Sequence, residues 1–316
     1  MVKFFITGGF GFIGSHLIEG IFNAFPNSKI TILDKVTYAA DKKYLSKIIK
    51  SKRIKFIKND LCNAKSYSKY LKNTNFAINV AAESHVDNSF KNSVNFTKTN
   101  TLGAHIFFQE CLEKKVENII HISTDEVYGD KVKGKSNESD NLNPTNPYSA
   151  SKAAIEIILK SYSFFSLKKI LIVRANNIIG TRQYPEKLIP HCITSLLKNK
   201  KITIHGNGQN KRCYLFVKDF VNAMLILIKK NKKGIYNIGN HISYKNIEVA
   251  KLICDMMNKD PKKFIKMTID RPFNDTRYSI NYNKIKRLKW SPKFNLKKIL
   301  NIILPWYQKN YKKFDI

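Results

Sequence analysis

Near its beginning the chain reads Phe4-Phe5-Ile6-Thr7-Gly8-Gly9-Phe10-Gly11-Phe12-Ile13-Gly14, and a helical pattern follows over residues 15–25. The first four residues of this segment predict a buried strand, so the glycines lie between a strand and a helix. Gly8 and Gly11 permit a tight turn and a close approach of the backbone to a pyrophosphate, and Gly14 lets the helix pack on the strand. The N-terminus of the helix then faces the anion. The segment therefore predicts the first βαβ unit of a dinucleotide-binding sheet.

A second strand is expected over residues 29–33, and it ends at Asp34, twenty residues after Gly14. A carboxylate at this place accepts hydrogen bonds from the ribose of adenosine and repels a 2′-phosphate. NAD is therefore the predicted cofactor. Lys35, directly beside Asp34, keeps NADP open as the alternative.

Further strands are expected at residues 54–57, 76–80, 118–123, 170–174 and 234–239. Strands that alternate with helical segments favour an α/β fold, here a Rossmann-type doubly wound parallel sheet with a second, smaller α/β substrate-binding domain. Pro185 and Pro190 mark a loop that leaves the first domain. The predicted division is an NAD-binding Rossmann domain of residues 1–178 and 212–240, and a substrate domain of residues 179–211 and 241–316.

Composition excludes several classes of protein. The 316 residues contain 43% apolar side chains but no long uninterrupted apolar run, so neither a signal peptide nor a membrane span is expected. The five cysteines have no CxxC pair and no nearby histidine at a zinc spacing; they are Cys62, Cys111, Cys192, Cys213 and Cys254. We therefore expect a reduced, cytoplasmic protein without a metal site.

The formal net charge of +33 raises the alternative of a nucleic-acid partner. Only 7 of the 56 basic residues are arginines, and the lysines are spread along the whole chain. Clusters of arginine with interleaved aromatic residues are missing from the sequence. We therefore expect neither nucleic acid nor a membrane as a partner, although such a surface attracts anionic substrates.

Two segments carry side chains suited to hydride and proton chemistry. Ser123-Thr124-Asp125-Glu126 follows the fifth expected strand, at the sheet edge where open parallel sheets bind ligands. Tyr148 and Lys152 are four residues apart and share a helix face, so the ammonium is expected to stabilise the phenolate and lower the pKa of Tyr148 towards neutral. Tyr148 is thus a candidate base. The same spacing and an acidic turn also occur without a catalytic role, so these residues alone leave the choice open.

Six ordered segments together resemble an extended short-chain dehydrogenase/reductase. They are TGGFGFIGS from Thr7, AAESHVDNS from Ala81, STDEVYG from Ser123, NPYSASK from Asn146, NNxxGxRQYPEKLIP from Asn176 and RPFNDTRY from Arg271. The resemblance runs essentially end to end, and it is closest to the nucleoside-diphosphate-glucose 4,6-dehydratases. Related 4-epimerases and glucuronate decarboxylases lack the Asp-Glu pair, and the inverting N-acetylglucosamine dehydratases carry Lys at the position of Glu126.

The resemblance implies a reaction with bound NAD. Tyr148, assisted by Lys152 and Thr124, takes the proton of the glucose 4-hydroxyl while hydride leaves C4. Glu126 then removes the C5 proton and a protonated Asp125 donates to the departing 6-hydroxyl. Return of hydride to C6 gives the 4-keto-6-deoxy sugar. The alternatives are a sugar-nucleotide 4-epimerase or decarboxylase of the same family, and a non-catalytic NAD-binding or nucleic-acid-binding protein.

Binding roles are also implied by the resemblance, which makes the smaller domain a nucleotide-sugar-binding domain. The catalytic set is Thr124, Asp125, Glu126, Tyr148 and Lys152. Cofactor contacts are expected from Gly8, Gly11, Phe12, Ile13, Gly14, Asp34, Lys35, Thr37, Asp60, Leu61, Ala81, Ala82, Thr99, Tyr148 and Lys152. Substrate contacts are expected from Ser84, His85, Thr124, Asn177, Glu186, Lys187, Leu188, Arg212, Asn246, Arg271, Asn274 and Arg277. Departures from the family pattern at Ile179 and at residues 212–214 touch the substrate side.

Two further expectations follow from the resemblance. The segments VDNSF from Val86 and RPFNDTRY from Arg271 resemble the UDP-glucose enzymes of eukaryotic rhamnose synthesis more than the bacterial dTDP-glucose enzymes, chiefly through Phe273 and Asn274. UDP-glucose is therefore favoured over dTDP-glucose, in rhamnose or other deoxysugar biosynthesis. Family members pair through two helices, expected here at residues 94–112 and 150–165, so a homodimer is expected.

Overall fold

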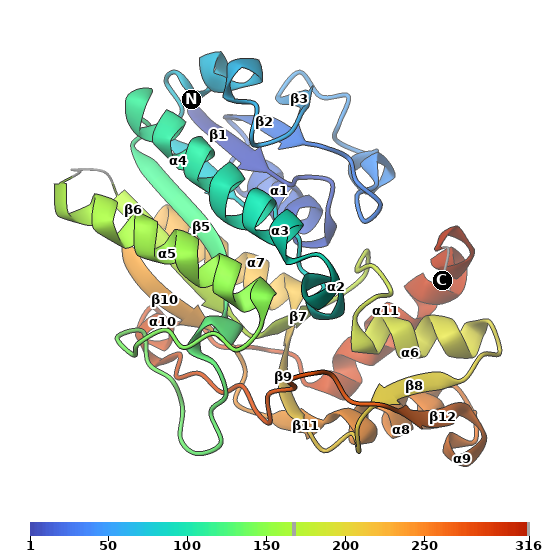
Figure 1. Cartoon of the computed structure of the whole chain (residues 1–316). Coiled ribbons are helices and arrows are strands. Elements are labelled where there is room, and N and C mark those ends of the chain that lie inside the picture. Colours follow the sequence, from blue (N-terminus) through green and yellow to red (C-terminus); the bar gives the residue numbers. More distant parts are fainter. Residues whose placement is uncertain (166–168, 315–316) are drawn as a thin grey trace.

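The structure, a computed structural model, describes residues 1–165 and 169–314 (Figure 1). Seven parallel strands form its central sheet: β1 (Val2–Thr7), β2 (Ser28–Asp34), β3 (Ile54–Lys58), β4 (Phe76–Asn79), β5 (Asn118–Thr124), β6 (Lys169–Ala175) and β10 (Gly234–Ile238). Their order is β10-β6-β5-β4-β1-β2-β3, so the chain leaves β1 first to one side and then returns to the other. This order confirms the predicted doubly wound Rossmann-type sheet, with its switch point between β1 and β4.

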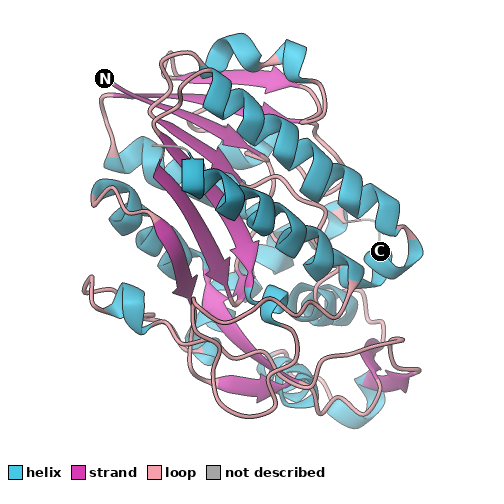
Figure 2. Ribbon diagram, turned by 60° about the vertical axis from the view of Figure 1, so that its left-hand side comes forward, coloured by secondary structure: helices cyan, strands magenta, loops and turns pink. Residues whose placement is uncertain are grey.

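Helices cover both faces of this sheet (Figures 1 and 2). One face carries α1 (Phe12–Ala24) and α7 (Val217–Lys229), and the other carries α4 (Ala104–Glu113) and α5 (Pro147–Phe165). Alternate residues of β1 enter different cores: Phe4 belongs to the buried cluster of α1 and α7, and Phe5 to that of α4 and α5. Because successive side chains of a strand point to opposite faces, a continuous apolar run is what a strand buried on both sides requires.

A smaller lobe lies beyond the carboxyl ends of the large sheet (Figure 1). It contains a three-stranded sheet of β7 (Asn177–Ile179), β9 (Lys211–Phe216) and β11 (Ser243–Lys245), and a two-stranded sheet of β8 (Ile202–His205) and β12 (Ile265–Thr268). Its helices are α6 (Leu188–Leu197), α8 (Asn246–Met256), α9 (Pro261–Phe264) and α11 (Leu296–Asn310), while α10 (Asn283–Lys286) lies beside β10. The chain thus crosses to the smaller lobe after β6 and returns to the large sheet through α7 and β10.

A long helical run connects β4 to β5. It consists of α2 (Val86–Lys91), α3 (Ser93–Phe96), a wider π-helical segment over Thr97–Gly103, and α4. Short 3₁₀ turns elsewhere are Lys42–Leu45, Ala64–Ser66, Ser68–Leu71, Asp125–Tyr128 and Tyr311–Lys313. Within residues 1–165 and 169–314, no helix combines the length and the apolar character needed to cross a bilayer.

The glycine segment differs from the expectation in one respect. Helix α1 begins at Phe12, three residues before the predicted start at Ser15. A Cβ on Gly14 would lie 2.0 Å from the carbonyl oxygen of Gly8, so only glycine allows this first helical turn to press against the loop. The predicted start was wrong because the low helix propensity of glycine is outweighed here by that close packing.

Candidate active site

The predicted catalytic residues converge at the carboxyl end of β5. Thr124 is the last residue of the strand, and its Oγ1 accepts a hydrogen bond from the backbone N of Glu126 (3.2 Å), which starts the turn Asp125–Tyr128. Helix α5 places Tyr148 and Lys152 beside this turn, and all five predicted catalytic residues are buried. The strand end and the helix thus hold an acidic pair, a phenol and an ammonium in one water-poor region.

The two adjacent carboxyls have different surroundings. The pKa of Asp125 is raised to about 7, chiefly because burial disfavours the charged carboxylate, and the charge of Glu126 adds to this increase. A hydrogen bond from Asn176 Nδ2 to Asp125 Oδ2 (2.7 Å) lowers the pKa and offsets part of it. Glu126 instead accepts a hydrogen bond from Asn146 Nδ2 at its Oε2 (3.3 Å). An acid that is half protonated near neutral pH is suited to donating a proton.

Tyr148 and Lys152 do not interact as their spacing predicts. The Nζ of Lys152 donates to the carbonyl oxygen of Ile122 (2.6 Å), and burial lowers the pKa of this ammonium to about 7 although the charge of Glu156 raises it. Burial and the charge of Glu126 raise the pKa of Tyr148, and a hydrogen bond with Thr124 lowers it. The expected lowering of the phenol pKa was therefore wrong for this arrangement, because desolvation beside carboxylates outweighs the helical neighbour.

The glycine loop packs closely against the segment that follows β4, with no room for a side chain at Gly8. Gly8 has φ +67°, and a Cβ there would meet Ala81 Cα at 2.7 Å. At the end of β2, Asp34 accepts hydrogen bonds from the backbone N of Phe10 (2.8 Å) and of Val36 (2.6 Å). This buried carboxylate follows the loop at the place where a dinucleotide presents its adenosine ribose. The residues present therefore fit a dinucleotide cofactor.

The position of Lys35 bears on the choice between NAD and NADP. Its Nζ lies 2.8 Å from Oδ2 of Asp60, and that hydrogen bond is the main reason that the pKa of Lys35 is raised. A lysine engaged by a carboxylate is less available to a 2′-phosphate, and Asp34 beside it repels one. The geometry thus favours NAD.

Several predicted substrate residues carry a buried polar atom without a protein partner among the described residues. They are His85 Nδ1, Asn177 Nδ2 and Asn246 Oδ1. Buried polar atoms are nearly always satisfied in native proteins, so such atoms indicate places where a ligand supplies the partner. Nearby, Lys187 Nζ donates to the carbonyl oxygen of Ser84 (2.5 Å), which joins the substrate segment of the smaller lobe to the end of β4.

Sequence reasoning missed the asparagines that support the site. Asn146 holds Glu126 and Asn176 holds Asp125, as described above, while Asn100 Nδ2 donates to Glu83 O (2.9 Å) and to Ser151 Oγ (3.0 Å). Asn146 and Asn176 stand at the first positions of two of the quoted segments. The amide side chains at these two positions were the signal that could have predicted a supporting role, because an amide next to a buried carboxylate can donate a hydrogen bond that orients it.

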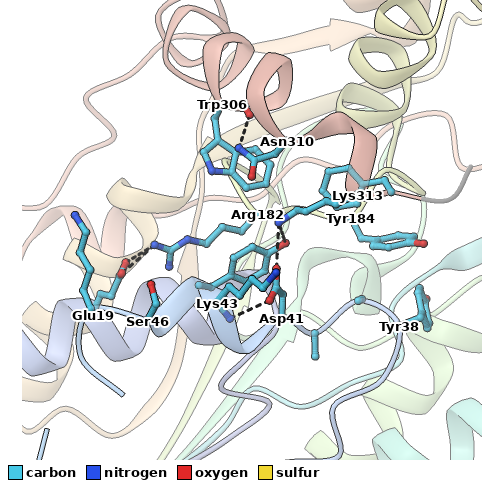
Figure 3. Close-up of a pocket in the computed structure, with 15 residues that line it drawn as sticks. Glu19, Tyr38, Asp41, Lys43, Ser46, Arg182, Tyr184, Trp306, Asn310 and Lys313 are labelled. Atoms are coloured by element: carbon cyan, nitrogen blue, oxygen red, sulfur yellow. Dashed lines mark hydrogen bonds and ion pairs between the residues drawn. The ribbon is translucent and has the colours of Figure 1, made fainter. Parts of the chain in front are cut away.

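A cavity of about 590 Å³ lies apart from these residues, between α1, the turn Lys42–Leu45 and α11 (Figure 3). Inside it, Arg182 pairs with Glu19 (2.9 Å) and Lys313 pairs with Asp41 (3.2 Å). Both of these cations thus have a carboxylate partner, and none of the lining residues belongs to the predicted catalytic set. The residues predicted to be catalytic therefore lie at the end of β5 and not around this cavity.

The other groups that could carry chemistry are the cysteine thiols and the side chains able to bind metals. All five cysteines are free thiols, and four of them are buried. In the part of the chain that the structure describes, no group of three or more His, Cys, Asp or Glu side chains is placed to hold a metal ion.

Comparison with known proteins identifies the family. The model of the family described as GDP-mannose 4,6 dehydratase matches residues 5–303. A dTDP-D-glucose 4,6-dehydratase of Dictyostelium discoideum is 39% identical over 98% of this chain and 82% of its own length. A trifunctional protein of Arabidopsis thaliana, named for UDP-glucose 4,6-dehydratase and two later activities, is 37% identical over 96% of this chain but only 47% of its own length.

Among solved structures, the dTDP-glucose 4,6-dehydratase DesIV of Streptomyces venezuelae, with NAD and TYD bound, has a TM-score of 0.95 at 31% identity and covers 99% of both chains. The family match and these relatives extend along nearly the whole chain, and the acidic pair after β5 lies beside the tyrosine and lysine of α5. The chain therefore belongs to the GDP-mannose 4,6 dehydratase family, as a nucleoside-diphosphate-glucose 4,6-dehydratase of the extended short-chain dehydrogenase/reductases.

Proposed function

We propose that this protein dehydrates a nucleoside-diphosphate-glucose to its 4-keto-6-deoxy sugar, with NAD as the cofactor. The observation that carries the proposal is the buried pair Asp125 and Glu126 beside Tyr148. Removal of water across C5 and C6 needs one group that accepts a proton and one that donates a proton, and these adjacent carboxyls have the different surroundings that the two tasks require.

NAD, when bound, would supply the redox chemistry, as acceptor of the C4 hydride and as its donor to C6, with no net change of the cofactor. The glycine loop would hold its pyrophosphate, and Asp34 its adenosine ribose. We propose that the remaining predicted cofactor contacts, among them Thr99 in the π-helical segment, line the same edge of the sheet.

The chain's own side chains would move the protons. Tyr148 takes the proton of the 4-hydroxyl, Thr124 hydrogen-bonds the phenol, and the Lys152 ammonium adds a buried positive charge on the same helix. The 4-ketone that results acidifies the C5 proton, which Glu126 removes. Asp125, protonated, gives its proton to the 6-hydroxyl, which leaves as water. Burial of all these groups strengthens their mutual electrostatic interactions and excludes bulk water from the elimination.

Three other functions account less well for the buried residues of this site. A 4-epimerase needs no base at C5, so Glu126 would have no task, and a decarboxylase acts on a substrate that already carries a carboxyl group. A non-catalytic NAD-binding or nucleic-acid-binding protein would not require five buried ionisable or hydroxyl side chains in one place. The dehydratase assignment accounts for all five.

One experiment tests both the reaction and the preferred nucleotide. We expect incubation with UDP-glucose or dTDP-glucose to give a 4-keto product, with a higher kcat/KM for UDP-glucose. The UDP preference is a proposal that rests on Phe273 and on Asn274, whose Nδ2 donates to Asp270 Oδ1 (2.8 Å) beside Arg271. A galactosyl product would indicate an epimerase, and no product from either nucleotide would refute the dehydratase.

The size of the nucleotide preference is limited by its chemistry. The two nucleotides differ by a base methyl and the ribose 2′-hydroxyl, and a pocket gains only about 1–3 kcal/mol from one methyl. The relatives named above include one named for each nucleotide. A preference of roughly tenfold or more for dTDP-glucose, which is about 1.4 kcal/mol, would overturn the choice of UDP-glucose and leave the reaction type intact.

The pKa of Asp125 predicts a pH dependence. Because its pKa is raised to about 7, this carboxyl is protonated and able to donate below that pH, and it loses its proton above it. We expect kcat/KM to fall about tenfold per pH unit above about pH 7, and this decline to be absent in Asp125→Asn. Lys152, whose pKa is also about 7, is the other group that titrates here. Persistence of the decline in Asp125→Asn would assign it to Lys152.

The predicted domain division is also a proposal: residues 1–178 and 212–240 bind NAD, and residues 179–211 and 241–316 bind the nucleotide sugar. The large sheet supports the first part, although β9 (Lys211–Phe216) pairs with β7 and β11 of the smaller sheet. Hydrogen exchange with NAD or UDP added separately would test the division. Protection of β9 by NAD alone would support the proposed boundary, and protection by UDP alone would move it.

A homodimer and a cytoplasmic location complete the proposal. Large apolar side chains are exposed on the helical run after β4 and on α5: Val94, Leu102, Ile157 and Phe164. Pairing of these two helical surfaces between two copies would cover them, and a monomeric mass in light scattering at micromolar concentration would argue against it. The five free thiols are consistent with a reducing compartment, and recovery of the protein in a secreted or membrane fraction would contradict the location.

A further inference from the structure

The three arginines among the predicted substrate residues are held in different ways. Arg212 Nη1 donates to the carbonyl oxygens of Lys211 and Asp275, both at 2.9 Å. Arg277 Nη1 likewise donates to the backbone carbonyl oxygens of residues 131, 132 and 134, the nearest at 3.1 Å. Arg271 is paired with a carboxylate: its Nε lies 2.5 Å from Oδ1 of Asp87, and its Nη2 donates to Oδ2 at 3.0 Å. Arg212 Nη2 also donates to Asn274 Oδ1 (3.3 Å), and Arg277 Nη2 donates to Ser279 Oγ (3.0 Å). Arg271 is thus distinguished from the other two by its pairing with a carboxylate of the larger lobe.

The pair between Asp87 and Arg271 joins the two lobes. Asp87 lies in the first turn of α2, the helix that follows β4 in the chain, and Arg271 follows β12 in the smaller lobe. The segment around Arg271 contains no helix or strand between Thr268 and Asn283. Its local anchor is Asp270, whose Oδ1 accepts a hydrogen bond from the backbone N of Arg271 (2.8 Å). That contact orients the backbone but leaves the guanidinium to be oriented by Asp87.

Asp87 also faces histidines from both lobes. His85 Nε2 lies 3.5 Å and His205 Nε2 3.9 Å from its Oδ2, and His191 of α6 is close enough to influence both rings electrostatically. Burial acts to raise the pKa of Asp87, but the hydrogen bond and charge of Arg271 outweigh it and hold this pKa below its usual value. The carboxylate is therefore ionised at neutral pH and remains paired.

We propose that Asp87 is a positioning residue for the substrate, which holds Arg271 across the lobes so that the free edge of the guanidinium receives the diphosphate. A guanidinium has five N–H donors. Asp87 accepts a hydrogen bond from Nη2 and is in ion-pair contact with Nε, which makes no hydrogen bond within the described residues. The donors on Nη1 remain for a phosphate oxygen, in the planar geometry that arginine offers to such groups. The inference rests on the proposed function, because it takes a nucleoside diphosphate as the ligand.

Two physical effects of Asp87 oppose one another. A side chain that is already ordered loses less conformational freedom when the ligand binds, which favours affinity. The negative charge of Asp87 repels a diphosphate, which disfavours it. In our proposal the ordering of Arg271 is the larger effect, because Asp87 makes two short contacts to the guanidinium and lies near two imidazoles. The direction in which the Kd for UDP changes when Asp87 is replaced decides between the two effects.

The test is binding of UDP to the full-length protein with NAD bound, measured by calorimetry, together with the kinetics of dehydration. Asp87→Asn keeps the size of the side chain and removes its charge. We expect the Kd for UDP and the KM for the nucleotide sugar to rise roughly tenfold, about 1.4 kcal/mol, with kcat and its pH profile unchanged. Asp87→Glu should restore part of the affinity.

Glu117→Gln is the matched control. It removes the same charge at the opposite, amino-terminal edge of the sheet, where Glu117 Oε1 lies 3.8 Å from Lys169 Nζ, and it should change neither Kd nor KM. In an Arg271→Gln background, Asp87→Asn should cause little further loss, because Asp87 acts through Arg271.

An unchanged or lower Kd in Asp87→Asn would overturn the positioning role, as would a loss of kcat at constant KM. Wild-type protein that binds UDP without dehydrating a nucleotide sugar would refute the proposed reaction while the effect of Asp87 on binding still stands. Wild-type protein that binds neither UDP nor dTDP would refute both.

Discussion

Glu126→Gln should leave the reduced cofactor on the protein and lower the rate of 4-keto-6-deoxy product formation by about 10²- to 10⁴-fold. Glutamine keeps the size of Glu126, and its amide oxygen can accept the hydrogen bond that Asn146 Nδ2 now donates. The first hydride transfer does not use Glu126, so it should proceed. Removal of the C5 proton requires a base, which glutamine is not.

The measurement follows nicotinamide reduction and product formation in the same reaction. Glu117→Gln is the control, because it makes the same substitution at the far edge of the sheet, away from the candidate site. This variant should behave as wild type. Dehydration by Glu126→Gln at the wild-type rate would show that another group removes the C5 proton.

Tyr148→Phe should have the opposite pattern: neither reduced cofactor nor product should accumulate, with the first step slowed by about 10²- to 10⁴-fold. Phenylalanine preserves the ring, which packs edge-on against Phe96 with 6.4 Å between centroids, so the fold of α5 should persist. Only the oxygen that receives the 4-hydroxyl proton is lost. The buried environment that raises the pKa of Tyr148 would make a solvent base a poor substitute.

Tyr162→Phe is the matched control on the same helix. Its hydroxyl contacts His105 (2.6 Å) on the neighbouring helix α4, away from the acidic pair, and its loss should leave both steps intact. If reduced cofactor accumulates in Tyr148→Phe, a residue other than Tyr148 removes the proton of the 4-hydroxyl. Together, Glu126→Gln and Tyr148→Phe divide the reaction at the 4-ketone.

Local sequence was sufficient for the first part of the fold. The apolar run of β1 predicts a strand covered on both faces, and Phe4 and Phe5 do enter different cores. The glycines predict a close approach of loop and helix, and Gly14 has no room for a Cβ. These inferences succeed because strand periodicity and the absence of a side chain are properties of neighbouring residues. Only the start of α1 was misplaced, since packing against Gly8 allows glycine inside a helix.

The candidate site was predicted as a set of residues, but its electrostatics were not. Spacing on one helix suggested that Lys152 lowers the pKa of Tyr148, whereas the structure turns Lys152 towards Ile122 and surrounds the phenol with buried carboxyls. A pKa depends on desolvation and on every charge nearby, and most of these come from segments distant in sequence. Helical spacing therefore could not determine the direction of this shift.

The presence of the strands along the chain, the glycine loop and the acid at the end of β2 were determined by the sequence alone, because each depends on residues a few positions apart. Tertiary structure decided which charges meet. Lys35 pairs with Asp60, and Asp87 pairs with Arg271, 184 residues later in the chain. Such pairs form only when packing brings distant segments within hydrogen-bonding distance, and no local periodicity specifies which lysine or arginine a given carboxylate will contact.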